Sequence, residues 1–163
     1  MKKARPKLHE RSAIRGNDVY DTGRCMIEVV AALIWDENRF LICQRPEHKA
    51  RPLLWEFPGG KVEPGESLED ALSRECKEEL DIALAVGSPF CDVTHEYADV
   101  TIHLSVMNAV IIKGSPQLIE HNDLRWIRIE DLQQFTFCPA DDAITRFFHS
   151  NKDGLRCHAE ASN

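Results

Sequence analysis

The spacing of apolar residues along the chain predicts several strands interspersed with two helices. A nearly continuous apolar run over 26–35 is typical of a buried central strand. Asp36-Glu37-Asn38 predicts a turn that leads into a second strand over 39–44, so the two form a hairpin. Other strand-like runs follow at 53–57, 83–86, 90–95, 101–112 and 124–129.

Two segments have helical periodicity instead. The first is 66–80, and the second is 139–149, with Pro139 near its first turn. Polar loops are expected at 46–52 and 114–122. Strands interspersed with two helices indicate an α/β fold in which a mixed sheet is covered on both faces.

The glutamates of the first predicted helix do not follow the pattern of a solvated face. At about 100° per residue, Glu75 and Glu79 fall within the apolar stripe that Leu68 and Leu72 begin, and Glu78 lies on its border. Carboxylates packed together on an inward face repel each other unless cations compensate them. Three carboxylates at i, i+3 and i+4 suit a hard divalent cation such as Mg²⁺ or Mn²⁺.

Length and charge narrow the class of protein. The 163 residues, 43% of them apolar, are enough for one domain with a real core. Residues 1–24 carry seven Lys or Arg and three Asp or Glu, whereas the other 139 residues carry 13 and 24. An acidic body argues against binding a nucleic acid polymer. It still permits binding of a small polyphosphate through divalent metals.

The sequence also predicts where the protein works. No apolar run approaches the roughly 18 residues that a membrane helix needs, and no apolar segment follows the basic start as in a secretory signal. The six cysteines form no C-x-x-C pair, which argues against a zinc ribbon or finger and favours reduced thiols. We therefore expect a cytoplasmic protein with no membrane partner.

The stretch around the first helix matches a known motif. Gly60 is followed after five residues by Glu66, and after seven more by Arg74-Glu75-Cys76-Lys77-Glu78-Glu79. This arrangement resembles the Nudix box. Cys76 stands where the box usually has an aliphatic residue, and Asp81 replaces the usual glycine after the helix, where an Asp can still adopt a left-handed C-cap.

The flanking segments LWEFPGGKVEPGE and CPAD make the chain similar to the MutT-type branch of that family. The resemblance implies a Nudix α/β/α sandwich with a mixed β-sheet between helices. It covers residues 25–150, which we take as the Nudix hydrolase domain, between a basic N-terminal tail (1–24) and a C-terminal tail (151–163). It also implies Mg²⁺-dependent hydrolysis of nucleoside triphosphates to the monophosphate and pyrophosphate, with Mn²⁺ as a possible substitute.

The resemblance assigns the metal ligands and a structural pair. The Mg²⁺ ligands it implies are Glu75, Glu78, Glu79 and the Gly59 carbonyl, completed by Glu120 from the 114–122 loop. Either Glu75 or Glu120 would serve as the general base for the attacking water. Glu66 and Arg74 would pair to brace the loop against the helix.

The resemblance likewise implies a substrate pocket. Arg45 would contact a phosphate, because it lies fifteen residues before Gly60, and a guanidinium fork suits that contact. The nucleoside pocket would be lined by Glu56, Phe57, Pro58 and Gly59. Asp141 follows Pro139-Ala140, where the MutT branch commonly has an Asn that reads 8-oxoguanine.

Because position 141 is an Asp, the sequence does not decide which nucleobase the pocket binds. An Asn donates to O6 and accepts from N7–H of 8-oxoguanine, whereas an ionised Asp only accepts and suits the amino group of cytosine. A protonated Asp, its pKa raised by burial, would both donate to O6 and accept from N7–H of 8-oxoguanine. Plain helix capping is the alternative without a substrate role.

The function predicted first is therefore removal of oxidised guanine nucleotides such as 8-oxo-dGTP, which protects DNA replication. The alternatives are a pyrophosphohydrolase for CTP, modified cytosine nucleotides or another nucleoside diphosphate derivative, and a non-catalytic nucleotide-sensing module. In each case the expected partner is a small nucleotide, and the protein is expected to be a monomer or homodimer.

Overall fold

The computed structural model describes residues 26–150 and contains the predicted hairpin of β1 (Met26–Asp36) and β2 (Arg39–Gln44). The remaining strands are β3 (Trp55–Glu56), β4 (Gly59–Lys61), β5 (Ala83–Glu96), β6 (Thr101–Lys113) and β7 (Asp123–Ile127). The helices are α1 (Leu68–Leu80), α2 (Pro139–Ser150) and a short 3₁₀ helix, η1 (Ile129–Gln134).

The strands form one mixed sheet. Its order is β3-β2-β1-β6-β5, with β4 paired to β1 and β7 paired to β2. β1 runs parallel to β6, and the other pairs are antiparallel. Along its other edge β1 pairs first with β4 and then with β2, which makes it the central strand.

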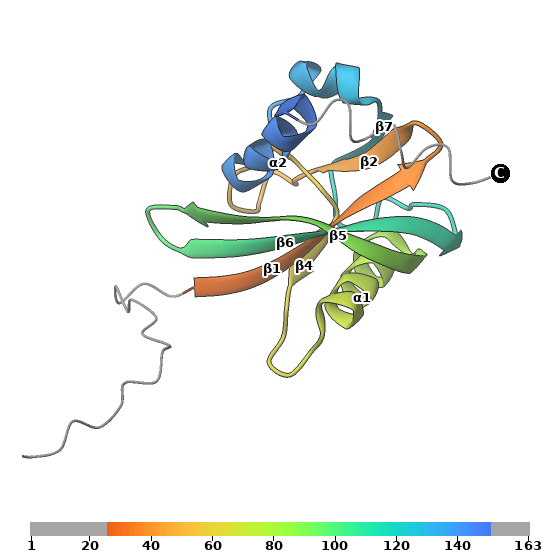
Figure 1. Cartoon of the computed structure of the whole chain (residues 1–163), viewed down its shortest axis with the longest axis horizontal. Coiled ribbons are helices and arrows are strands. Elements are labelled where there is room, and N and C mark those ends of the chain that lie inside the picture. The colour runs from red at the N-terminus through yellow and green to blue at the C-terminus, as the bar shows by residue number, and fades with distance from the viewer. Residues whose placement is uncertain (1–25, 151–163) are drawn as a thin grey trace, which may run out of the picture.

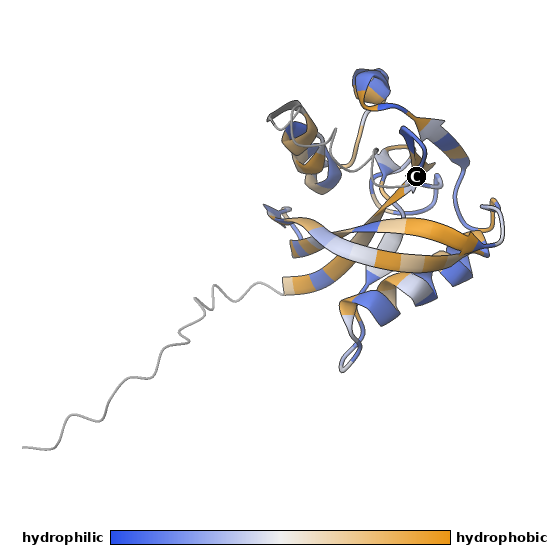
Figure 2. Ribbon diagram, turned by 45° about the vertical axis from the view of Figure 1, so that its right-hand side comes forward, coloured by the Kyte–Doolittle hydropathy of each residue, from blue (hydrophilic) through white to orange (hydrophobic). Residues whose placement is uncertain are grey.

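Alternation along β1 supplies both halves of the core. Val30, Ala32 and Ile34 pack in the cluster that includes the buried residues of α1, whereas Ala31 and Leu33 pack in the cluster that includes those of α2. Figure 1 shows α1 on one face of the sheet and α2 on the other. The apolar stretches of the central strands run between these helices (Figure 2). The fold is the predicted α/β/α arrangement with a mixed sheet.

Three elements differ from the sequence prediction. The 59–61 segment, for which the sequence predicted no strand, is a strand that pairs with β1. The two strands expected before residue 96 are one strand, β5, in which register shifts around Pro89 absorb the break. The strand expected over 124–129 ends at Ile127, and η1 follows it.

The two predicted tails lie outside the described residues. Within residues 26–150, no helix is both long and apolar enough to cross a membrane. The cysteines in this range are free thiols, and three of them, Cys43, Cys76 and Cys138, are buried.

Candidate active site

The entry to α1 is fixed by Glu66, which lies just before the helix. Its carboxylate accepts from Arg74 Nε and Nη2, each at 2.9 Å, as the sequence predicts for this pair. Ser67 caps the helix by accepting from the Asp70 N–H. Asp81 ends it in the left-handed conformation expected for the C-cap (φ 55°, ψ 38°). The helix therefore starts two residues later than predicted, because Glu66 is used in the loop.

Two of the three predicted helix ligands point inward. The side chains of Glu75 and Glu79 are 15% and 13% exposed, whereas that of Glu78 is 60% exposed and lies 3.5 Å from Arg74. The Glu75 carboxyl packs directly on Gly60, since a Cβ placed there would lie 2.2 Å from Glu75 Cδ. Glycine at position 60 therefore makes room for an inward carboxylate.

The loop glutamate is brought to the helix through a lysine. Lys49 Nζ donates to Glu120 Oε2 at 2.7 Å and lies 3.8 Å from Glu79 Oε1. Lys49 comes from the loop between β2 and β3, and Glu120 from the loop before β7. The structure thus places Glu120 near Glu79, as predicted, with an ammonium group between the two carboxylates.

His121 is a site residue that the sequence did not assign. Its side chain is 3% exposed, and Nε2 lies 3.6 Å from both Glu56 Oε1 and Glu79 Oε2. Its Nδ1 is buried without a hydrogen-bond partner within residues 26–150. His121 links the predicted substrate residue Glu56 to the predicted metal ligand Glu79. Nothing in the local polar pattern of 114–122 distinguishes it, because the contact is made only by folding.

Arg45 and Glu56 form the next part of the site. Arg45 Nη1 donates to Glu56 Oε2 at 2.5 Å, and its Nε donates to the Ala50 carbonyl at 2.7 Å. Pro58, two residues after Glu56, is held by a backbone hydrogen bond: its carbonyl accepts from the Ala32 N–H at 2.8 Å. Gly59 follows in β4, opposite Ala31.

Asp141 lies in the first turn of α2, and its side chain reaches across to Phe57, the residue after β3. Its Oδ1 accepts from the Phe57 N–H at 2.9 Å, and the residue is buried. Burial, reinforced by the nearby Glu56 charge, raises the pKa of Asp141 to about 8. Burial therefore favours the protonated carboxyl, and the side chain joins the first turn of α2 to Phe57, another residue predicted for the base pocket.

Burial also changes the electrostatics of Glu79. It raises the pKa of Glu79 to about 7, against the opposing effects of His121 and Lys49, and the Glu75 and Glu120 charges add to the rise. The hydrogen bond from Lys49 holds the pKa of Glu120 below its ordinary value. The inward carboxylates therefore carry an unfavourable charge density, which a further cation would relieve.

These residues fit a divalent cation by their chemistry. Among residues 26–150, no three His, Cys, Asp or Glu side chains already stand in an arrangement that could hold a metal ion. Basic partners compensate them instead: Arg74 Nη1 donates to Glu75 at 2.8 Å, and Lys49 holds Glu120. An all-oxygen donor set with a backbone cradle at Gly60 suits Mg²⁺ or Mn²⁺, provided that these side chains exchange partners.

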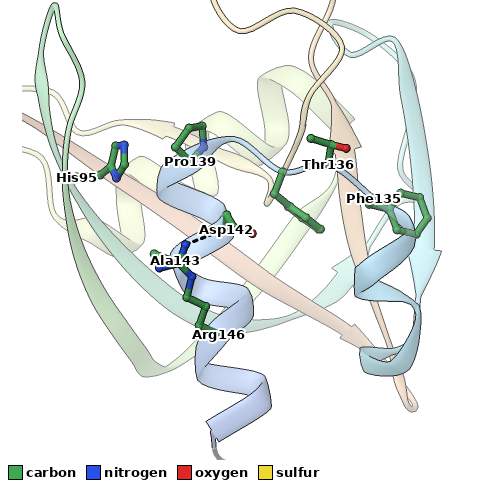
Figure 3. Close-up of a pocket in the computed structure, with 8 residues that line it drawn as sticks. His95, Phe135, Thr136, Pro139, Asp142, Ala143 and Arg146 are labelled. Carbon is green, nitrogen blue, oxygen red and sulfur yellow. Dashed lines mark hydrogen bonds and ion pairs between the residues drawn. The ribbon is translucent and has the colours of Figure 1, made fainter.

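A separate hollow of about 440 Å³ opens beside the start of α2, and none of the predicted site residues lines it. Figure 3 shows His95 and Pro139 at one side of it and Phe135 at the other, with the Asp142–Arg146 pair on the helix. The candidate active site is therefore not this hollow. It is the region of Glu75, Glu79 and Glu120, together with the contact between Asp141 and Phe57.

The fold, the helix glutamates and the Glu66–Arg74 pair agree with the resemblance to the Nudix family. Comparison with known families gives the same result. Residues 29–146 match the NUDIX domain family, so the chain belongs to that family. Relatives of this chain are named as nucleotide pyrophosphohydrolases and diphosphatases, and the chain is a Nudix hydrolase.

Particular relatives are similar over most of their length. The chain is 41% identical over 123 residues to the CTP pyrophosphohydrolase of Escherichia coli K12, covering 76% of this chain and 91% of the relative. It is 39% identical over 80 residues to the 8-oxo-dGTP diphosphatase of Proteus vulgaris, covering 48% and 71%. The crystal structure of a MutT protein from Methanosarcina mazei Go1 superposes with a TM-score of 0.71 at 28% identity, covering 82% of this chain and all of that one.

Proposed function

We propose that this protein hydrolyses a nucleoside triphosphate to the monophosphate and pyrophosphate in a reaction that depends on Mg²⁺, with Mn²⁺ as a substitute. The observation that carries the proposal is the inward pair Glu75 and Glu79: Glu75 packs against Gly60, and Glu79 lies close to Glu120, with Lys49 between them. We further propose that it works in the cytoplasm as a monomer or homodimer.

The metal ligands proposed are Glu75, Glu78, Glu79, Glu120 and the Gly59 carbonyl. When bound, the divalent cation neutralises phosphate charge and lowers the pKa of a bound water. Glu78 is the most exposed of these side chains, and it would have to leave Arg74 to hold the cation. Glu75 or Glu120 then orients the water and takes its proton.

Arg45 is the proposed phosphate-binding residue. Its Nε and Nη1 are engaged by Ala50 and Glu56, which fixes the plane of the guanidinium. Nη2 is therefore the nitrogen that we assign to a substrate phosphate. The attacked atom is the second phosphorus, so that the monophosphate leaves and the new oxygen goes to pyrophosphate.

The base pocket is proposed at Phe57 and Asp141. A protonated Asp141 carboxyl offers a donor next to an acceptor, and burial favours that protonated form. Cytosine presents N3 as an acceptor beside the N4 amino donor, and 8-oxoguanine presents O6 beside N7–H. The neutral carboxyl is complementary to both edges.

Of the two candidate substrates, cytosine nucleotides and oxidised guanine nucleotides, we place cytosine nucleotides first. This reverses the order predicted from the sequence. The 41% identical relative covers most of both chains and carries the name CTP pyrophosphohydrolase. The relative named 8-oxo-dGTP diphosphatase from Proteus vulgaris aligns with less of this chain. Oxidised guanine nucleotides are the second candidate, because Asp141 in its neutral form fits them as well.

The test is a substrate panel. CTP, dCTP, 5-methyl-dCTP, 8-oxo-dGTP and the other dNTPs are incubated with Mg²⁺, and kcat/KM is measured from pyrophosphate release. The proposal expects the highest kcat/KM for a cytosine nucleotide. Pyrophosphate from none of them would defeat it. Tight nucleotide binding without turnover would point instead to the sensing module.

A further inference from the structure

The position of Lys49 bears on how the proposed metal site is filled. Its ammonium group bridges two predicted metal ligands, at 2.7 Å from Glu120 Oε2 and 3.8 Å from Glu79 Oε1. The two glutamates come from different elements, the loop before β7 and helix α1. A single lysine therefore stands where a cation would join them.

The loop that carries Lys49 is anchored at its ends. The Arg45 N–H donates to the Leu54 carbonyl at 2.9 Å, and the Leu53 N–H donates to the Arg45 carbonyl at 3.1 Å. Arg45 Nε also binds the Ala50 carbonyl. These contacts hold the loop backbone over the site, so Lys49 can change partners by side-chain rotation while its Cα stays in place.

Lys49 is held less firmly than the other two cations of the site, Arg74 and Arg45. Arg74 is held by Glu66 in a two-nitrogen contact, and Arg45 is fixed by Glu56 and Ala50. The Lys49 side chain is 37% exposed, and its ion-pair partners are Glu79 and Glu120. It is the cation that a divalent metal displaces most easily.

Resting on the metal dependence proposed above, we infer that Lys49 is a tethered counter-ion that occupies the Glu79–Glu120 site before the metal and binds a substrate phosphate after it. The metal and the ammonium compete for the same carboxylate oxygens. Once displaced, the ammonium remains on a loop next to Arg45, where metal-bound phosphates would supply its new partners. Lys49 is thus a phosphate-binding residue with opposite effects on metal and phosphate binding.

The inference is tested by Mn²⁺ titration calorimetry on the nucleotide-free enzyme. Lys49→Gln is expected to bind Mn²⁺ about fivefold more tightly, because the competing partly exposed ion pair is gone. Lys49→Arg, which keeps the charge, and Lys113→Gln, which removes an exposed lysine that makes no contact with Glu79 or Glu120 in the ion pairs of the site, should stay within about twofold of wild type. Circular dichroism checks the fold of each variant.

A second titration uses inorganic pyrophosphate with saturating Mn²⁺, so that it depends neither on the base nor on turnover. Lys49→Gln is expected to bind pyrophosphate about tenfold more weakly, and Lys49→Arg to restore binding. Unchanged or weaker Mn²⁺ binding in Lys49→Gln would overturn the counter-ion role. Unchanged pyrophosphate binding would overturn the phosphate role. Neither result depends on whether any nucleotide is hydrolysed.

Discussion

At the scale of single residues, the candidate site contains carboxyl groups whose surroundings differ. Glu79 is an inward carboxylate near Glu75, Lys49 and His121, whereas Asp141 is buried against the Phe57 N–H. Both have raised pKa values because burial disfavours their charged forms. The Lys49 ammonium favours the charged form of Glu79, which is the form that a metal ligand needs, and the protonated form of Asp141 suits a hydrogen-bonding role.

The Glu79→Gln variant tests the metal-ligand role. Glutamine keeps the shape but lacks the charge, so kcat/KM should fall about 100-fold or more. The fold should remain, because a buried charge has been removed. Glu69→Gln, an exposed residue of the same helix, is the control and should leave the rate unchanged. Activity of Glu79→Gln within about tenfold of wild type would remove Glu79 from the ligand set.

The pH dependence of stability tests the buried state of Asp141. Its folded-state pKa of about 8 lies above the ordinary value of 3.8, so the native protein binds the proton more tightly than the unfolded chain. The corresponding stability is fully present below about pH 4 and is lost as pH rises through about 8.

Urea unfolding without metal or nucleotide is the measurement. Between about pH 5 and pH 8 the unfolding free energy of Asp141→Asn should decline less than that of wild type, since its amide does not titrate. The exposed Asp36→Asn should retain the wild-type slope. Parallel curves for wild type and Asp141→Asn would show that the carboxyl is ionised in the folded protein.

At the scale of elements, α1 was readily predicted because its apolar stripe and its caps are local. The 100° spacing placed Glu75 and Glu79 inward, and the structure agrees. Glu66–Arg74 pairing followed from the family resemblance. β4 was missed, because Gly59-Gly60-Lys61 carries no apolar alternation and becomes a strand only by pairing with β1.

Gly60 in β4 and Gly65 in the loop before α1 are needed for different reasons: Gly60 leaves room for a site side chain, and Gly65 gives the backbone a positive φ. A Cβ at Gly60 would overlap the Glu75 carboxyl, whereas Gly65 has open space around it but a φ of +85°. Gly60→Ala should therefore push Glu75 aside and reduce kcat/KM by about tenfold or more, with a small loss of stability. Gly65→Ala should cost about 1 kcal/mol of stability and leave kcat/KM near wild type.

Thermal unfolding and kcat/KM are measured on the two variants together. We expect Gly60→Ala to lose mainly activity and Gly65→Ala to lose mainly stability. Loss of stability alone in Gly60→Ala would mean that Glu75 is not held against this backbone for catalysis.

At the scale of the whole molecule, the sheet brings to one place residues that lie far apart in the chain. Arg45, Glu56, Glu79 and His121 meet only because β2, β3, α1 and the loop before β7 converge. The sequence predicted the fold, and the motif named several of the residues that the structure brings together here. It gave no role to Lys49 or His121, because their neighbours are set by tertiary packing and not by local spacing.

The central claim is that inward carboxylates and a divalent cation together cleave a nucleotide phosphoanhydride. Hydrolysis of the best substrate of the panel in heavy-oxygen water tests it most directly, with products analysed by mass spectrometry. With Mg²⁺ the account predicts the label in pyrophosphate and none in the monophosphate, and with a chelator it predicts no reaction. Label in the monophosphate, or an undiminished rate with the chelator, would contradict it.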